Sequence, residues 1–163
     1  MRHHHSWFGE GVDSGLLGGS AVAVWFLLHD VIIGKPLATP SILGLVLLFG
    51  QKRPAIDHPD FGAVVLYTAV HFLTFAAFGL VVTWCVHLSY RTALARFGLV
   101  VLFTIFEFLF YVVISTVRTE VSGYFPLFWV LSANLLATMV MGAYLWRRHP
   151  GLRRALGRTP LGV

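Results

Sequence analysis

Four long apolar stretches, separated by short polar segments, dominate the pattern of this chain. Three of them, at 61–88, 97–117 and 125–146, reach or exceed the roughly 20 residues that an α-helix needs to cross a bilayer. A fourth, at 15–33, is slightly shorter. The pattern predicts an all-α membrane protein, a bundle of four transmembrane helices that forms one domain over residues 1–163.

A shorter apolar run lies between the first and second stretches. Thr39 precedes Pro40, which is typical of a helix that begins with an N-cap threonine and a proline in the first helical position. Ten helical residues rise only about 15 Å, half the thickness of a bilayer. We therefore expect a re-entrant or interfacial half-helix at about 40–50, which does not cross.

The composition supports a membrane protein. The chain is 57% hydrophobic and 12% charged, with a mean hydropathy of +0.78, whereas about a quarter of the residues of a soluble domain are charged. The single cysteine, Cys85, lies inside an apolar stretch, so an intrachain disulfide is excluded.

The basic residues predict an orientation. With four crossings, eight of the 12 Lys and Arg residues fall on the side of the two termini. Cytoplasmic loops carry the excess of such residues, so both termini are expected in the cytoplasm of a bacterium, with the protein in the inner membrane. The basic tail 147–163 is interpreted as an anchor on anionic lipid headgroups. Nucleic-acid binding is not expected, because the tail carries no interleaved aromatic residues.

Three polar residues interrupt three different apolar stretches at similar depth. Counted from the outer ends, His71, Glu107 and Asn134 each lie roughly 13–15 Å into the membrane. Such groups are costly in contact with lipid, so we expect them to face one another inside the bundle. Tyr111 follows Glu107 by four residues, shares its helix face and joins the predicted polar network.

The first stretch adds a further polar candidate. Gly15, Gly19 and Ala23 form a face of small residues that allows close approach of another helix. The same face continues to Asp30, which should therefore point inward and pair with Lys35, Arg118 or His71. Its neighbour His29 is expected to point about 100° away.

Three interpretations of the polar layer remain open. It is a hydrogen-bonded plug that sets the register of the helices, a metal or haem site with His71 and Glu107 as candidate ligands, or a path for protons or a small solute. His87 lies about four turns from His71, so the two cannot share one iron. No phosphate-binding loop, paired-cysteine motif or catalytic constellation is present, and no cofactor is required by the sequence.

Residues 24–44, together with 67–72, resemble a group of small bacterial four-helix inner-membrane proteins. The resemblance covers roughly the first half of the chain and implies an inner-membrane location but no activity. It also implies that one unit is made of a helix end, a tight turn and a half-helix, with the residues Asp30, Gly34, Pro36, Thr39, Pro40 and His71.

Taken together, the sequence predicts a non-catalytic integral membrane protein. We expect an accessory or packing subunit of a larger respiratory or photosynthetic complex, in contact with membrane lipids and with other subunits or copies of itself. The alternative is a metal-, haem- or proton-handling protein that uses His71, Glu107 and Asn134.

Overall fold

A computed structural model describes residues 7–52, 54, 58–89, 108, 112, 125 and 127–149. Within these residues the fold is entirely helical, with α1 (Trp7–Ile32), α2 (Ala38–Leu47), α3 (Phe61–Ser89) and α5 (Leu127–Arg148). Phe108 and Val112 are helical as well. The rest of the predicted crossing at 97–117, including Glu107 and Tyr111, lies outside the described residues.

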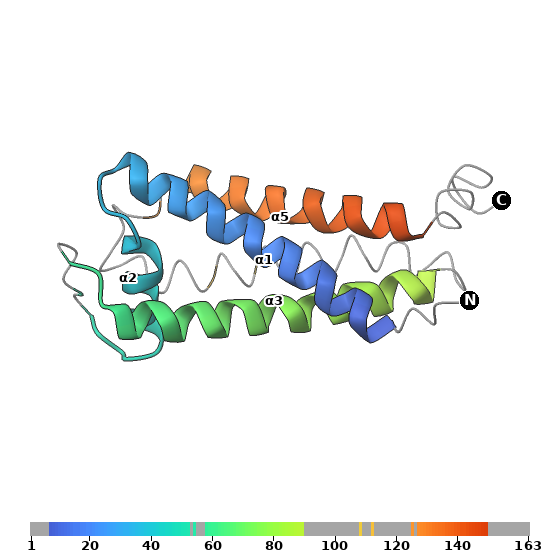
Figure 1. Ribbon diagram of the computed structural model, residues 1–163, viewed down its shortest axis with the longest axis horizontal. Helices are drawn as coiled ribbons and strands as arrows, with labels where there is room; N and C mark the ends of the chain where they lie inside the picture. The colour runs from blue at the N-terminus through green and yellow to red at the C-terminus, as the bar shows by residue number, and fades with distance from the viewer. Residues whose placement is uncertain are drawn as a thin grey trace.

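The three long helices lie lengthwise beside one another, and α1 crosses α3 obliquely (Figure 1). Short α2 lies at one end of the molecule, beside the end of α1 and the start of α3. At the opposite end lie the start of α1 and the ends of α3 and α5. Side chains of all four helices meet in the core, which includes Phe26, Ile42, Phe75 and Ala137.

Helices α1, α3 and α5 are each long and apolar enough to span a membrane, with mean hydropathies of 1.6, 2.0 and 1.6. This indicates a membrane protein. Helix α2 has only 10 residues, which rise about 15 Å and cannot span a bilayer.

Helix α1 begins at Trp7, eight residues before the expected start at residue 15. The added turns contain Glu10, Asp13 and Ser14, which break the apolar pattern. The structure accommodates Glu10 and Ser14 because both are buried against other helices.

Glycines set the close approach of α1 and α3. A Cβ on Gly15 would collide with the backbone oxygen of Phe75 and lie 2.7 Å from the Cα of Ala76. A Cβ on Gly79 would collide with the Gly11 carbonyl and lie 2.5 Å from the Gly15 nitrogen. Gly15 therefore faces a helix, as the small-residue pattern predicts, and the two backbones touch where neither carries a side chain.

A tight turn ends α1. Gly34 has φ +72, a left-handed conformation that favours glycine. Its N–H donates to the Val31 carbonyl at 3.0 Å, and the Lys35 N–H donates to the Asp30 carbonyl at 2.8 Å. These two bonds form the Schellman motif that commonly terminates helices.

The start of α2 differs from the prediction. The helix begins at Ala38, and its N-cap residue is Leu37, which has φ 66 and makes no side-chain cap hydrogen bond. The expected cap by Thr39, with Pro40 as the first helical residue, is therefore wrong. The capping group comes instead from another helix, as described next.

Candidate functional site

Asp30, near the end of α1, caps the start of α2. Its carboxylate is 1% exposed and accepts the backbone N–H of Thr39 at 2.7 Å on Oδ2. It also accepts the Thr39 hydroxyl at 2.6 Å on Oδ1. Thr39 is the second residue of α2, so Asp30 supplies from a distance the acceptor that an N-cap side chain normally supplies. A carboxylate at this position also complements the positive end of the helix dipole.

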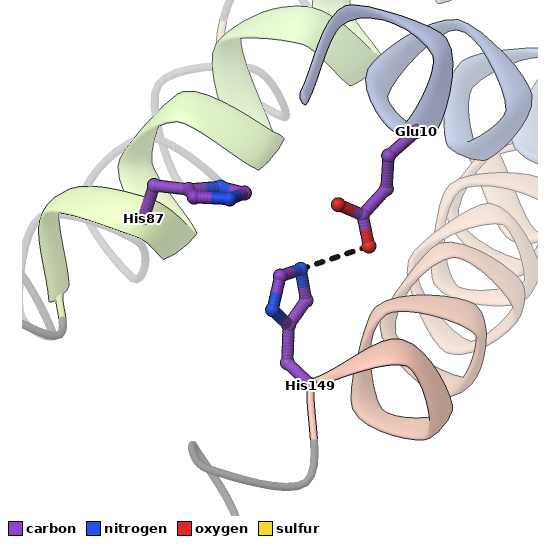
Figure 2. Close-up of side chains that lie close together, drawn as sticks. All are labelled: Glu10, His87 and His149. Carbon is purple, nitrogen blue, oxygen red and sulfur yellow. Dashed lines mark ion pairs between the residues drawn. The ribbon is translucent and has the colours of Figure 1, made fainter. Parts of the chain in front are cut away.

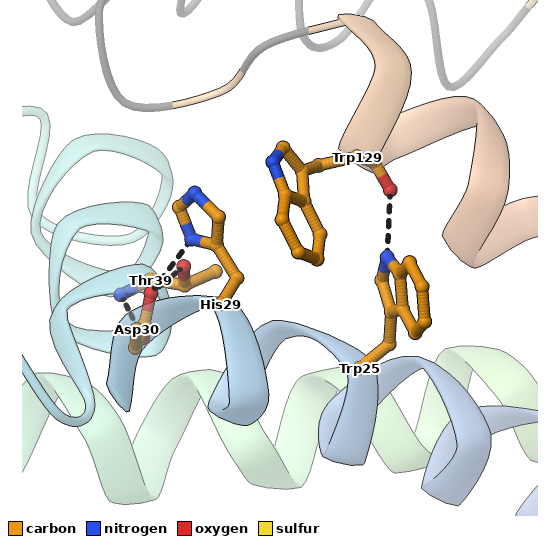
Figure 3. A network of polar contacts seen from close by, with 5 residues as sticks. All are labelled: Trp25, His29, Asp30, Thr39 and Trp129. Atoms are coloured by element: carbon orange, nitrogen blue, oxygen red, sulfur yellow. Dashed lines mark hydrogen bonds and ion pairs between the residues drawn. The ribbon is translucent and has the colours of Figure 1, made fainter. Parts of the chain in front are cut away.

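His29 joins this network and connects it to α5 (Figure 3). The buried imidazole places Nδ1 at 3.3 Å from Asp30 Oδ1. The ring packs against Trp129 of α5, with ring centroids 4.7 Å apart, whereas Asp30 faces α2. Trp25 completes the connection, since its Nε1–H donates to the Trp129 carbonyl at 3.2 Å.

A second cap connects α2 to α3. The Asp60 N–H donates to the Ser41 hydroxyl oxygen at 2.9 Å. Asp60 Oδ1 in turn accepts the Ala63 N–H at 2.8 Å, which is the usual N-cap geometry for α3. The start of α2 is thus held by a side chain of α1, and the N-cap residue of α3 is held by a side chain of α2.

His71 binds the backbone of α1. Its Nε2–H donates to the Gly19 carbonyl at 3.0 Å, between positions far apart in sequence. The ring packs against Phe75, with centroids 4.8 Å apart, and lies 5.9 Å from the ring of Tyr67. Gly19 also faces α3, since a Cβ there would lie 3.1 Å from Phe75 Cβ and 3.3 Å from Phe72 Cδ1.

One cavity of about 180 Å³ brings together three of the predicted site residues. Asp30, His71 and Asn134 all line it, among mostly apolar neighbours. Glu107 and Tyr111, the other two predicted members, and Arg118, a predicted partner of Asp30, lie outside the described residues. The described contacts of the Asp30 carboxylate are with Thr39 and His29.

A second cluster lies at the other end of the bundle (Figure 2). Glu10 from the first turn of α1, His87 from the last turn of α3 and His149, directly after α5, point toward one another. His149 Nε2 and Glu10 Oε1 are 2.8 Å apart, and the two imidazole centroids are 5.0 Å apart. One ligand atom from each residue lies within 4.8 Å of the others, a grouping that can hold a metal ion.

The sequence analysis did not identify this cluster. Glu10 preceded the expected start of the first crossing, and His149 fell in the basic tail, so neither was assigned to a helix end. The available signal was positional. All three residues lie at helix ends on the side of the bundle that holds the start of α1.

Comparisons with protein families, with curated proteins and with solved structures found no match to this chain.

Proposed function

We propose that this chain is a non-catalytic integral protein of the bacterial inner membrane, an accessory or packing subunit of a larger respiratory or photosynthetic complex. In this proposal residues 97–117 form a fourth crossing, α2 lies at the outer face and both termini are cytoplasmic. The excess of Lys and Arg on the side of the termini supports that orientation.

An outward row on α5 is the observation that carries the proposal. The row follows the spacing of three and four residues that places side chains on one helix face. Its large members are 44–71% exposed: Phe128, Leu131, Leu135, Met139 and Trp146. Gly142 lies in the same row, and a Cβ built there meets nothing within 4 Å. Small residues of this kind allow another membrane helix to approach closely.

The interior polar contacts support a structural role for the polar layer. Asp30 caps α2, and His71 donates to the Gly19 carbonyl. Each contact joins two elements of the bundle and satisfies groups that would be costly in lipid. Such contacts are expected of a polar layer that sets the register of the helices. We therefore assign the function of the molecule to its outer surface.

Extraction of the protein from native membranes in mild detergent tests the proposal. We expect it to migrate on native gels in an assembly of fixed composition, with partners present at constant stoichiometry by quantitative mass spectrometry. Gly142→Leu should reduce the yield of that assembly, whereas Ala77→Leu, the same kind of change at an exposed position of α3, should not. Migration of the wild-type chain alone would contradict the proposal.

The cavity favours a second candidate function, the handling of a metal, haem or proton by His71, Glu107 and Asn134. Two of these residues line one largely apolar cavity, which is a common setting for a ligand site. The same purified material tests this function through its absorption spectrum and metal content. A chromophore or metal that is lost in His71→Leu, in protein that still folds, would establish this second function in place of the packing role of the layer.

A further inference from the structure

The cluster of Glu10, His87 and His149 has the composition of a transition-metal site. Two imidazoles and one carboxylate are ligands that suit zinc and related divalent ions. Three protein ligands from separate elements also match the pattern of zinc sites that keep one coordination position open. The cluster lies at the end of the bundle where α1 starts (Figures 1 and 2), whereas the cavity is lined by residues of the second half of α1, of α2 and of the first half of α3.

Hydrogen bonding of His87 orients it for such a role. Its Nδ1–H donates to the Thr83 carbonyl at 2.9 Å, one turn earlier in α3. Metal-binding histidines commonly donate their second ring N–H to a backbone carbonyl, which sets the tautomer and the ring direction. With the proton on Nδ1, the Nε2 lone pair of His87 is the one that can coordinate an ion.

The spacing of the three groups requires only a small adjustment around an ion. Ligand atoms about 2.1 Å from a tetrahedral zinc lie roughly 3.4 Å from one another. Here the atoms lie within 4.8 Å of one another, and the His149–Glu10 pair, at 2.8 Å, would open by about 0.6 Å. His87 is exposed at the end of α3, whereas Glu10 is buried.

Two charged side chains near the cluster, Asp13 and Arg148, both contact Tyr144. The Tyr144 hydroxyl donates to Asp13 Oδ2 at 3.3 Å, and the Arg148 guanidinium lies over the Tyr144 ring at 5.4 Å. Asp13, one turn after Glu10, offsets part of the positive charge of Arg148 at this end of the bundle.

We propose that Glu10, His87 and His149 bind one divalent transition-metal ion, with zinc as the expected ion. The metal takes the place of the direct contact between His149 and Glu10 and joins the start of α1 to the ends of α3 and α5. Because the three ligands come from three helix ends, binding stabilises the bundle at this end. An open fourth position accepts water or a group from a neighbouring molecule.

Binding of Zn²⁺ to the purified full chain in detergent tests the site. His3, His4 and His5 are replaced by glutamine in every sample, so that the histidines before the start of α1 do not contribute to binding. After chelation and dialysis, we expect one equivalent of Zn²⁺ to bind and to raise the thermal midpoint. Co²⁺ should give the visible absorption of a tetrahedral site with nitrogen and oxygen ligands.

His87→Ala is the leading variant, because the exposed imidazole can be removed with little effect on folding. It should weaken Zn²⁺ binding more than about 10-fold, because loss of a ligand costs at least as much as loss of a group that hydrogen-bonds a ligand. It should also abolish the Zn²⁺-induced shift in the thermal midpoint. Glu10→Gln and His149→Ala should do the same, each checked for helical content by circular dichroism. His58→Ala, an exposed histidine in the segment before α3, serves as the matched control and should bind normally.

Two results would overturn the site. These are no stoichiometric binding of Zn²⁺, or unchanged affinity in His87→Ala. Either of them would assign the cluster to a metal-free ion pair between His149 and Glu10. The proposed packing role of α5 is independent of this outcome.

Discussion

Two aspartate side chains cap helix starts at one end of the bundle. Asp30 caps α2 through the Thr39 N–H and hydroxyl, and Asp60 caps α3 through the Ala63 N–H. An N-cap contributes about 1 kcal/mol, and a buried donor left without its acceptor costs about 1–3 kcal/mol. The burial of Asp30 therefore makes it the cap whose loss should be felt most.

Asp30→Ala should lower the free energy of unfolding by about 2 kcal/mol, because α2 loses its cap and the Thr39 hydroxyl loses its acceptor. Reversible denaturation in detergent micelles measures this change. Asp13→Ala is the control: Asp13 is exposed and accepts the Tyr144 hydroxyl at 3.3 Å, so its loss should cost under about 0.5 kcal/mol. Equal effects of the two substitutions would show that Asp30 does not cap α2.

The packing of α1 on α3 depends on positions that carry no side chain. Gly15 faces the backbone of Phe75 and Ala76, and Gly79 faces Gly11 and Gly15 in return. Membrane helices gain little from hydrophobic burial against one another, so close backbone contact of this kind provides much of their association.

Gly15→Ala and Gly142→Ala make the same chemical change with opposite expected signs. At Gly15 the added methyl collides with the α3 backbone, and overpacking should cost about 1–3 kcal/mol. At Gly142 the methyl meets open space, and the helix gains up to about 1 kcal/mol from the better propensity of alanine. Thermal midpoints of the isolated protein in detergent measure both. A loss of stability in Gly142→Ala, or none in Gly15→Ala, would contradict the described packing.

The apolar pattern predicted some element bounds closely and missed others for identifiable reasons. The stretches at 61–88 and 125–146 lie within two residues of α3 and α5, since apolar length alone marks both. The start of α1 was missed because Glu10 and Ser14 are polar, and their burial depends on other helices. The cap of α2 was misassigned because Thr39-Pro40 is a local signal, whereas Asp30 lies nine residues earlier.

The site was predictable only to the level of depth and helix face. Counting residues placed His71 and Asn134 at similar depth, and both line one cavity. The acceptor of His71 is a backbone carbonyl of α1, which no pattern of side chains can indicate. The Glu10, His87 and His149 cluster requires three helix ends to meet, so it follows from the tertiary arrangement.

At the scale of the whole molecule, the two ends of the bundle differ in character. One end carries α2 and the caps around Asp30 and Asp60, and the other carries Glu10, His87, His149 and the arginines that end α5. The proposed orientation places the first end outside and the second in the cytoplasm. The side of the membrane on which the proposed metal cluster lies depends on this orientation.

Labelling of single cysteines tests the arrangement most directly. Cysteines are placed one at a time in a Cys85→Ala background at Pro36, before α2, at Gln51, after α2, and at Arg147, near the end of α5; all three positions are exposed. Intact cells with a permeable outer membrane are treated with a membrane-impermeant maleimide. We predict labelling of the cysteines at positions 36 and 51 in intact cells, and of the cysteine at 147 only after lysis. Labelling of positions 36 and 51 from opposite sides would show that α2 crosses, and labelling of position 147 from outside would reverse the orientation.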